Sequence, residues 1–231
     1  MKPVKALVIA NVVAGLFATT SAYAFSLSSV SSAIGGSSSS GSSSDAATDN
    51  LASQDALVKA FVASEIEVLT AQSLLEKAYG LKDDAAACDA QVKSLQSDGV
   101  DSDTIKKTVD LSNKANAVIA ERQSKGASLS DEEKQYYIQS LPHFAKGIIG
   151  THDVVSKAAT FTAGLKNAGS NVGSLLSIGT SKLKSGLFIA ESTPAYSKNL
   201  FDVFRKTVTI GQSNGVKVPA DATSALGGLD G

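Results

Sequence analysis

The 231-residue sequence has no tryptophan, one cysteine and two histidines. A single cysteine excludes a disulfide within the chain, so we expect the fold to be stabilised by apolar packing. His143 and His152 lack the acidic residue three positions earlier that a Glu-x-x-His metal motif requires. No Gly-x-Ser-x-Gly sequence is present to carry a nucleophile. The sequence therefore favours a protein that is not an enzyme, with no catalytic residues, no metal site and no cofactor.

Long apolar runs are missing after residue 24, so we expect no integral membrane span in the mature chain. Lys2 and Lys5 precede an apolar core at residues 6–18, and Ala22-Tyr23-Ala24 has the small-x-small pattern of a signal peptidase site. We predict a signal peptide over residues 1–24, cleaved after Ala24. The mature protein is then expected to be periplasmic or secreted.

A strong excess of either charge is also absent. Without Lys2 and Lys5 the chain has 19 basic and 22 acidic residues, a balance that gives no support for a nucleic-acid partner. The charges are distributed unevenly: residues 45–110 have 13 acidic and 6 basic residues, whereas residues 111–231 have 9 acidic and 13 basic. We favour pairing of acidic and basic helices in one bundle over a dipole that attracts a partner.

Serine dominates residues 26–44, and a segment of this composition is too polar to join a core. We predict a Ser-rich flexible linker over residues 25–48. Helical periodicity then continues over residues 49–212, which is long enough for one self-supporting domain. The segment 213–231 contains several Gly residues and a Pro and is predicted to be a loose tail.

The stretch Ser53–Tyr79 contains neither glycine nor proline, and Gly80 follows it as a helix stop. At about 100° per residue its apolar side chains fall on one face: Leu57, Phe61, Val68, Leu75 and Tyr79. A helix cannot bury such a stripe alone. We therefore expect the remaining helices to pack around Ser53–Tyr79.

Two shorter helices are predicted next, one over Asp83–Ser97 and one that starts at Asp101 or Ser102 and ends near Gly126. On the second, an apolar face is interrupted by polar residues; the face consists of Ile105, Val109 and Ile119, with Ser112 and Asn116 between them. Because this stripe is narrow, the two helices are expected to form a peripheral hairpin.

Ser130 and Glu133 have the spacing of a capping box, which predicts a helix start. Pro142 lies inside the following segment, so the helix either kinks there or ends at Ser140 before a new one begins; Gly169 is the predicted stop. A further helix is predicted over 171–190, and Thr193-Pro194 predicts the start of the last one. Strand signals are nearly absent. The expected fold class is all-α, a single bundle of about five to seven antiparallel helices.

Glu65, Gln72 and Glu76 form the most suggestive polar set, since they project between the apolar stripe and a second apolar row of the same helix. Buried carboxyl groups there would have raised pKa values and could bind a ligand or a cation. We favour instead a polar ridge in water. Cys88 lies in an alanine-rich segment, which favours a small buried residue over a thiol that pairs between chains. His152 is expected at the boundary of the core.

These patterns favour an exported binding or interaction module in the cell envelope, with a protein partner that the sequence does not identify. The alternative is a lipid-binding or membrane-active protein with peripheral lipid contact through residues 146–190. That stretch contains glycines and has an excess of lysine over its one acidic residue, Asp153: Lys146, Lys157, Lys166, Lys182 and Lys184.

Overall fold

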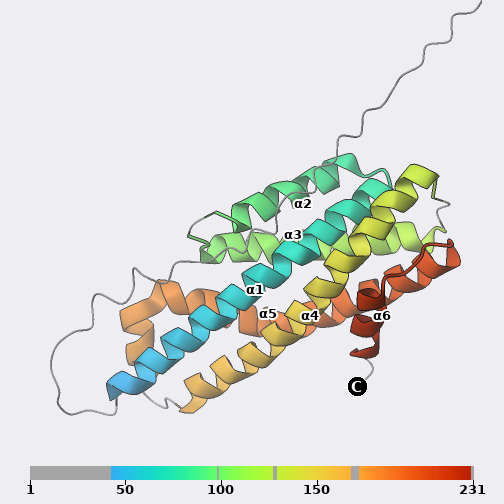
Figure 1. Cartoon of the computed structure of the whole chain (residues 1–231). Coiled ribbons are helices and arrows are strands. Elements are labelled where there is room, and N and C mark those ends of the chain that lie inside the picture. Colours follow the sequence, from blue (N-terminus) through green and yellow to red (C-terminus); the bar gives the residue numbers. More distant parts are fainter. Residues whose placement is uncertain (1–42, 98, 127–128, 168–171, 230–231) are drawn as a thin grey trace, which may run out of the picture. The chain divides into compact units, whose positions relative to one another are not determined.

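The computed structural model describes residues 43–97, 99–126, 129–167 and 172–229, with the side chains of 43–49, 167 and 172–182 excluded. These residues form six helices and no strand (Figure 1). The all-α prediction is therefore confirmed for the described part of the chain. The helices are α1 Ser43–Ala78, α2 Lys82–Leu95, α3 Ser102–Ser124, α4 Asp131–Asn167, α5 Val172–Ser213 and α6 Ala220–Gly227.

Helix α1 is the central element, because α2, α3, α4 and α5 all pack against it. The predicted apolar stripe is buried at Leu57, Phe61, Val68 and Leu75, and Tyr79 is half-buried at its end. The expectation that the other helices pack around this segment is confirmed. Because partners surround α1 on several sides, they also cover faces outside the apolar stripe.

The closest pairing is between α1 and α4, which run side by side in opposite directions (Figure 1). Two glycines of α4 allow this approach. A Cβ atom added at Gly147 would lie 2.6 Å from Val68 Cγ2, and one at Gly150 would lie 3.0 Å from Ser64 Cβ. The Ser64 hydroxyl donates to the Gly147 carbonyl at 2.9 Å. The absence of these two side chains lets the backbones of α1 and α4 come into contact.

Helices α3 and α5 run in the same direction. The Ser112 and Tyr196 hydroxyls are 3.0 Å apart, and closer to the C-terminal end of both helices Gln123 donates to Thr207 at 2.8 Å. Consecutive helices such as α1 and α2 are antiparallel, as expected, so the bundle combines both kinds of neighbour. The predicted α2–α3 hairpin forms, but α3 packs against α1 and α5 as well as α2 and is not confined to the periphery.

Helix starts that depend on nearby residues agree with the sequence prediction. Asp101 caps α3 by accepting from the Thr104 backbone N–H at 2.7 Å. At the start of α4, the Ser130 N–H donates to Glu133 at 2.6 Å and the Glu133 N–H donates to the Ser130 hydroxyl at 3.3 Å. This reciprocal pair is the predicted capping box.

Ser130→Ala is expected to lower the free energy of unfolding by about 1 kcal/mol, because the Glu133 N–H loses its acceptor. Chemical denaturation at neutral pH measures the change. Ser156→Ala, at an exposed position inside α4, is the matched control and is expected to leave stability unchanged or slightly raised. Equal stability of the Ser130 and Ser156 variants would contradict a stabilising capping box.

The structure corrects the prediction at Pro194 and decides between the two alternatives left open at Pro142. The predicted restart at Thr193-Pro194 is wrong, because α5 continues through both residues. The Thr193 hydroxyl does not cap a helix; it donates to the Ile189 carbonyl at 2.6 Å, within α5. At Pro142 the open alternative of two separate helices is excluded, since α4 is continuous from Asp131 to Asn167.

The outer boundaries differ from the sequence estimate at both ends. Helix α1 starts at Ser43, inside the segment predicted as linker, and α6 lies inside the segment predicted as a loose tail. Ala222 and Ala225 of α6 are buried, and the Arg205 side chain donates to the Leu229 carbonyl at 3.0 Å. The predicted signal peptide, residues 25–42 of the predicted linker and the predicted stop at Gly169 lie outside the described residues.

Candidate functional site

The polar set on α1 is buried. Glu65, Gln72 and Glu76 are each exposed by 1% or less. The favoured interpretation of a polar ridge in water is therefore wrong. The reason is tertiary: α3 and α5 cover the face that carries Glu65 and Gln72, and α2 covers Glu76, so the polar side of α1 is enclosed as fully as its apolar stripe.

Glu65 lies between α1, α3 and α5. Burial raises the pKa of its carboxyl group to about 8, and a hydrogen bond from the Tyr196 hydroxyl only partly opposes this. The second carboxyl oxygen, Oε2, has no hydrogen-bond partner among the described residues. A neutral carboxylic acid is the form that such a site accommodates near pH 7, because ionisation would leave a poorly compensated charge in the interior.

Tyr196 and Gln72 extend this contact into a chain of polar groups. The Tyr196 and Ser112 hydroxyls are 3.0 Å apart. The Gln72 amide donates to the Ser112 hydroxyl at 3.0 Å, to the Ser112 carbonyl at 3.0 Å and to Asn116 Oδ1 at 2.9 Å. We call these five residues the interior polar network: Glu65, Gln72, Ser112, Asn116 and Tyr196.

Some polar atoms of the interior polar network have no hydrogen-bond partner among the residues that the structure describes. Gln72 Oε1 and Asn116 Nδ2 are buried without a hydrogen-bond partner in the described residues, as is Glu65 Oε2. Each unpaired buried group costs about 1–3 kcal/mol. The unpaired atoms therefore reduce the stability that the network contributes to the contacts among α1, α3 and α5.

Glu76 lies one turn beyond Gln72 and faces Cys88 of α2. Burial raises the pKa of Glu76 to about 7; the hydrogen bond with the Cys88 thiol and the charge of Lys114 lower it, while Asp84 and Asp89 raise it. Cys88 is free and fully buried, which confirms the buried interpretation of this cysteine. Burial and the neighbouring Glu76 raise the pKa of the Cys88 thiol well above its usual range, so the thiol is held in its unreactive, protonated form.

A second polar cluster lies further along the same helices and was not found from the sequence. The Tyr137 hydroxyl donates to the Thr207 carbonyl at 2.7 Å, and Gln123 donates to the Thr207 hydroxyl at 2.8 Å. Tyr79 meets the edge of the Tyr137 ring at 6.2 Å. These residues come from α3, α4, α5 and the turn after α1 with no common spacing, so no local sequence signal connects them.

The two histidines have different surroundings. His143 Nδ1 is 2.6 Å from Glu67 Oε2 at a half-buried position. Burial alone would raise the pKa of Glu67, but the hydrogen bond to His143 and the charges of His143 and Lys146 hold it below its ordinary value. His152 is exposed and stacks on Phe201, with ring centroids 4.9 Å apart. The part of the chain that the structure describes contains no group of three or more residues suited to hold a metal ion.

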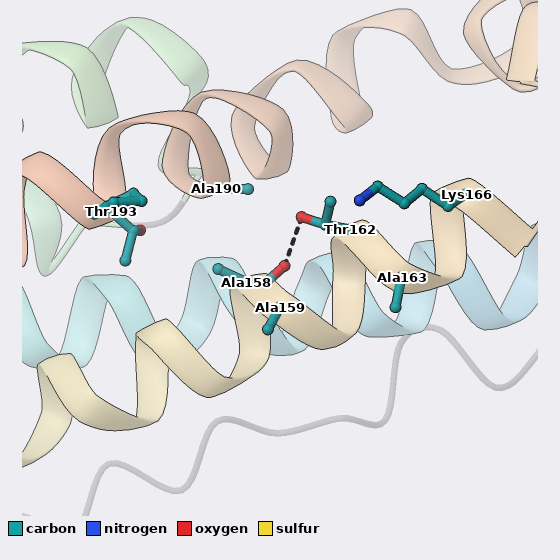
Figure 2. Close-up of a pocket in the computed structure, with 8 residues that line it drawn as sticks. Ala158, Ala159, Thr162, Ala163, Lys166, Ala190 and Thr193 are labelled. Atoms are coloured by element: carbon teal, nitrogen blue, oxygen red, sulfur yellow. Dashed lines mark hydrogen bonds between the residues drawn. The ribbon is translucent and has the colours of Figure 1, made fainter.

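An open groove lies between the second half of α4 and the middle of α5, with a volume of about 380 Å³ (Figure 2). We call it the α4–α5 groove. Its lining is formed almost entirely of small or apolar side chains: Ala158, Ala159, Thr162, Ala163, Lys166, Ala190, Thr193 and Pro194. No sequence motif predicted it, because the groove depends on how α4 and α5 are placed against each other.

The hydroxyl groups in the α4–α5 groove are already engaged within their own helices. Thr162 donates to the Ala158 carbonyl at 2.7 Å (Figure 2). Thr193 donates to the Ile189 carbonyl at 2.6 Å. Lys166 brings the only charged group to the lining, and its side chain extends along α4 toward Thr162 in Figure 2. The groove therefore combines an apolar surface with one ammonium group.

No protein-family model, curated protein or solved structure matches this chain. Across the described ranges, no helix is both long enough and apolar enough to cross a membrane.

Proposed function

We propose that this chain is an exported, non-enzymatic helical bundle that acts as a binding module in the cell envelope, with the α4–α5 groove as its binding surface. The groove is the observation that carries the proposal. Its volume of about 380 Å³ lies in the range of roughly 300–1,000 Å³ that is typical of binding pockets. The predicted signal peptide supports action outside the cytoplasm.

The lining favours a protein segment that places an apolar side chain in the groove and a carboxylate near Lys166. Alanine, threonine and proline side chains offer apolar contact without hydrogen-bond donors, since the two threonine hydroxyls are occupied. Lys166 is exposed and forms no ion pair with any described residue, so its ammonium group is available to a partner's charge. Val155, which is 39% exposed one turn before Ala159, extends the apolar surface.

Ala159→Trp is expected to fill the α4–α5 groove and reduce partner capture by about tenfold or more, the effect of losing roughly 1.4 kcal/mol of binding energy. The measurement is chemical crosslinking in the producing cell, followed by quantification of the captured protein. Ala87→Trp, at an exposed position of α2, is the matched control and is expected to leave capture unchanged. A partner that is captured equally well by both variants binds elsewhere and overturns the assignment of the groove.

A second candidate function is lipid binding, which the exposed lysines of α4 and α5 favour. Lys146, Lys166 and Lys184 are exposed on α4 and α5, and basic helices of this kind are attracted to anionic lipid surfaces. Co-sedimentation with anionic vesicles at low salt, lost on adding salt and weakened by Lys166→Glu, would favour this function. Absence of co-sedimentation would favour the protein-binding proposal.

A further inference from the structure

The interior polar network links one ionisable group, Glu65, to three helices. Glu65 belongs to α1, Tyr196 to α5 and Ser112 to α3, and the three side chains interact in sequence. Gln72, a second residue of α1, joins the network through its hydrogen bonds to Ser112 and Asn116. A change at Glu65 therefore acts on Tyr196 of α5 and, through the Tyr196 hydroxyl, on Ser112 of α3.

We propose that the interior polar network is a proton-controlled latch: it holds α3 and α5 against α1 when the Glu65 carboxyl group is protonated, and it loosens when that group is ionised. The geometry supports this in two ways. Glu65 is 1% exposed, and its Oε2 atom has no partner to stabilise a negative charge. Relief of that charge requires water to reach Glu65, and water reaches it only if α3 or α5 moves away.

The surrounding groups do not supply a compensating cation. From α5 the titratable group facing Glu65 is Tyr196, and the Tyr196 hydroxyl in turn meets the uncharged Ser112 of α3. Two basic groups of α4, His143 and Lys146, act on the neighbouring Glu67 and not on Glu65. Burial and the charge of Glu65 raise the pKa of Tyr196 above its ordinary value, so this hydroxyl stays protonated and remains a donor.

The expected pH range follows from the pKa of Glu65, which burial raises from 4.5 to about 8. Closing of the latch is accompanied by uptake of a proton between these two values. Each pH unit in this range is expected to change the closed-to-open ratio by up to about tenfold, with opening favoured at higher pH. Glu76 is a separate group on the α2 side; it faces Cys88, Asp84 and Asp89 of α2 and Lys114 of α3.

The latch also has a consequence for the α4–α5 groove, one that rests on the proposed function. Tyr196 follows Pro194, a lining residue of the groove, by two positions on α5. Movement of α5 at Tyr196 would shift that wall of the groove. Loss of the latch and loss of the groove's binding role remain separate results, because the latch is measured without any ligand.

Amide hydrogen exchange of the full chain at about pH 6 and about pH 8.5, corrected for intrinsic rates, tests the latch. We expect protection of α3 and of α5 around Tyr196 to fall by about tenfold or more at the higher pH in the wild type. Glu65→Gln, which keeps the side chain neutral, is expected to remove this change. Glu132→Gln, an exposed residue of α4, is expected to retain it.

Three results would overturn the latch. The first is equal protection of α3 and α5 at both pH values in the wild type. The second is an unchanged pH dependence in Glu65→Gln. The third is the same free energy of opening for α3, for α5 and for the α1–α4 pair at both pH values, because that result describes global unfolding and not the release of α3 and α5.

Discussion

Glu65→Gln is expected to stabilise the protein by about 2–4 kcal/mol at pH 8, an unusual result for a substitution in the interior. The wild-type carboxyl group has a pKa of about 8 when folded and 4.5 as its ordinary value. That difference corresponds to roughly 5 kcal/mol between the two protonation states, at 1.36 kcal/mol per pH unit. Gln carries no charge but brings an N–H group that must find a partner, which reduces the expected gain.

The direction in which stability changes with pH follows from proton uptake. Because the pKa of Glu65 is raised on folding, the folded state binds one more proton than the unfolded state between about pH 4.5 and pH 8. The wild type therefore loses stability as pH rises through this range, whereas Glu65→Gln does not. Denaturant unfolding at about pH 5 and about pH 8 measures the free energy of unfolding of both proteins. The two free energies should differ little at about pH 5.

Glu67→Gln provides a control of opposite sign on the same helix. The pKa of Glu67 is lowered on folding despite partial burial, because of its hydrogen bond to His143. Its ionised form contributes stability above its ordinary pKa, and this contribution is lost as pH falls through the folded pKa. Glu67→Gln is therefore expected to destabilise the protein at neutral pH. Destabilisation by Glu65→Gln at pH 8 would show that Glu65 is ionised and compensated in the folded protein.

The contrast between these two glutamates marks what the sequence could predict. Helical periodicity places Glu65, Gln72 and Glu76 along one line of α1, and that placement is correct. Whether Glu65 and Gln72 face water or another helix depends on α3 and α5, whose contacting residues Ser112 and Tyr196 are 40 or more positions away in the chain. Local spacing carries no information on such long-range contacts, so the burial was predicted incorrectly.

Signals whose partners lie within one turn were predicted more reliably. The Asp101 cap and the Ser130–Glu133 capping box involve residues three positions apart, and both form as expected. Thr193-Pro194 has an equally good local signal for a helix start, yet α5 passes through it. Ile189 before it and Tyr196 and Leu200 after it are all buried, so packing on both sides of the proline outweighs the hydrogen bond that the proline removes.

Gly147→Ala is expected to lower the free energy of unfolding by about 1–3 kcal/mol, even though alanine is the better helix former. The new methyl group would lie 2.6 Å from Val68 Cγ2 and 3.1 Å from the Val68 backbone nitrogen. Val68 is fully buried and its β-branched side chain has little rotational freedom. The α1 and α4 backbones must therefore separate, which also weakens the 2.9 Å hydrogen bond from Ser64 to the Gly147 carbonyl.

Gly227→Ala is the matched control, since Gly227 is also helical and an added Cβ atom there has no neighbour within 4 Å. The same substitution is expected to be neutral or to stabilise by up to about 1 kcal/mol, the gain in helix propensity. Denaturant unfolding of both variants separates the two effects. Equal stabilisation by both would mean that α1 and α4 do not approach closely at Val68.

Val68→Ala combined with Gly147→Ala tests whether the Cγ2 contact itself causes the loss. Removing Cγ2 relieves the 2.6 Å contact, whereas the 3.1 Å contact with the Val68 backbone remains. The double variant is expected to be more stable than the sum of the two single losses predicts, by about 0.5–1 kcal/mol or more, because the added methyl group occupies space that valine vacated. Strict additivity would place the strain at the backbone of Val68 and identify the α1–α4 distance, rather than side-chain crowding, as the reason that this position is glycine.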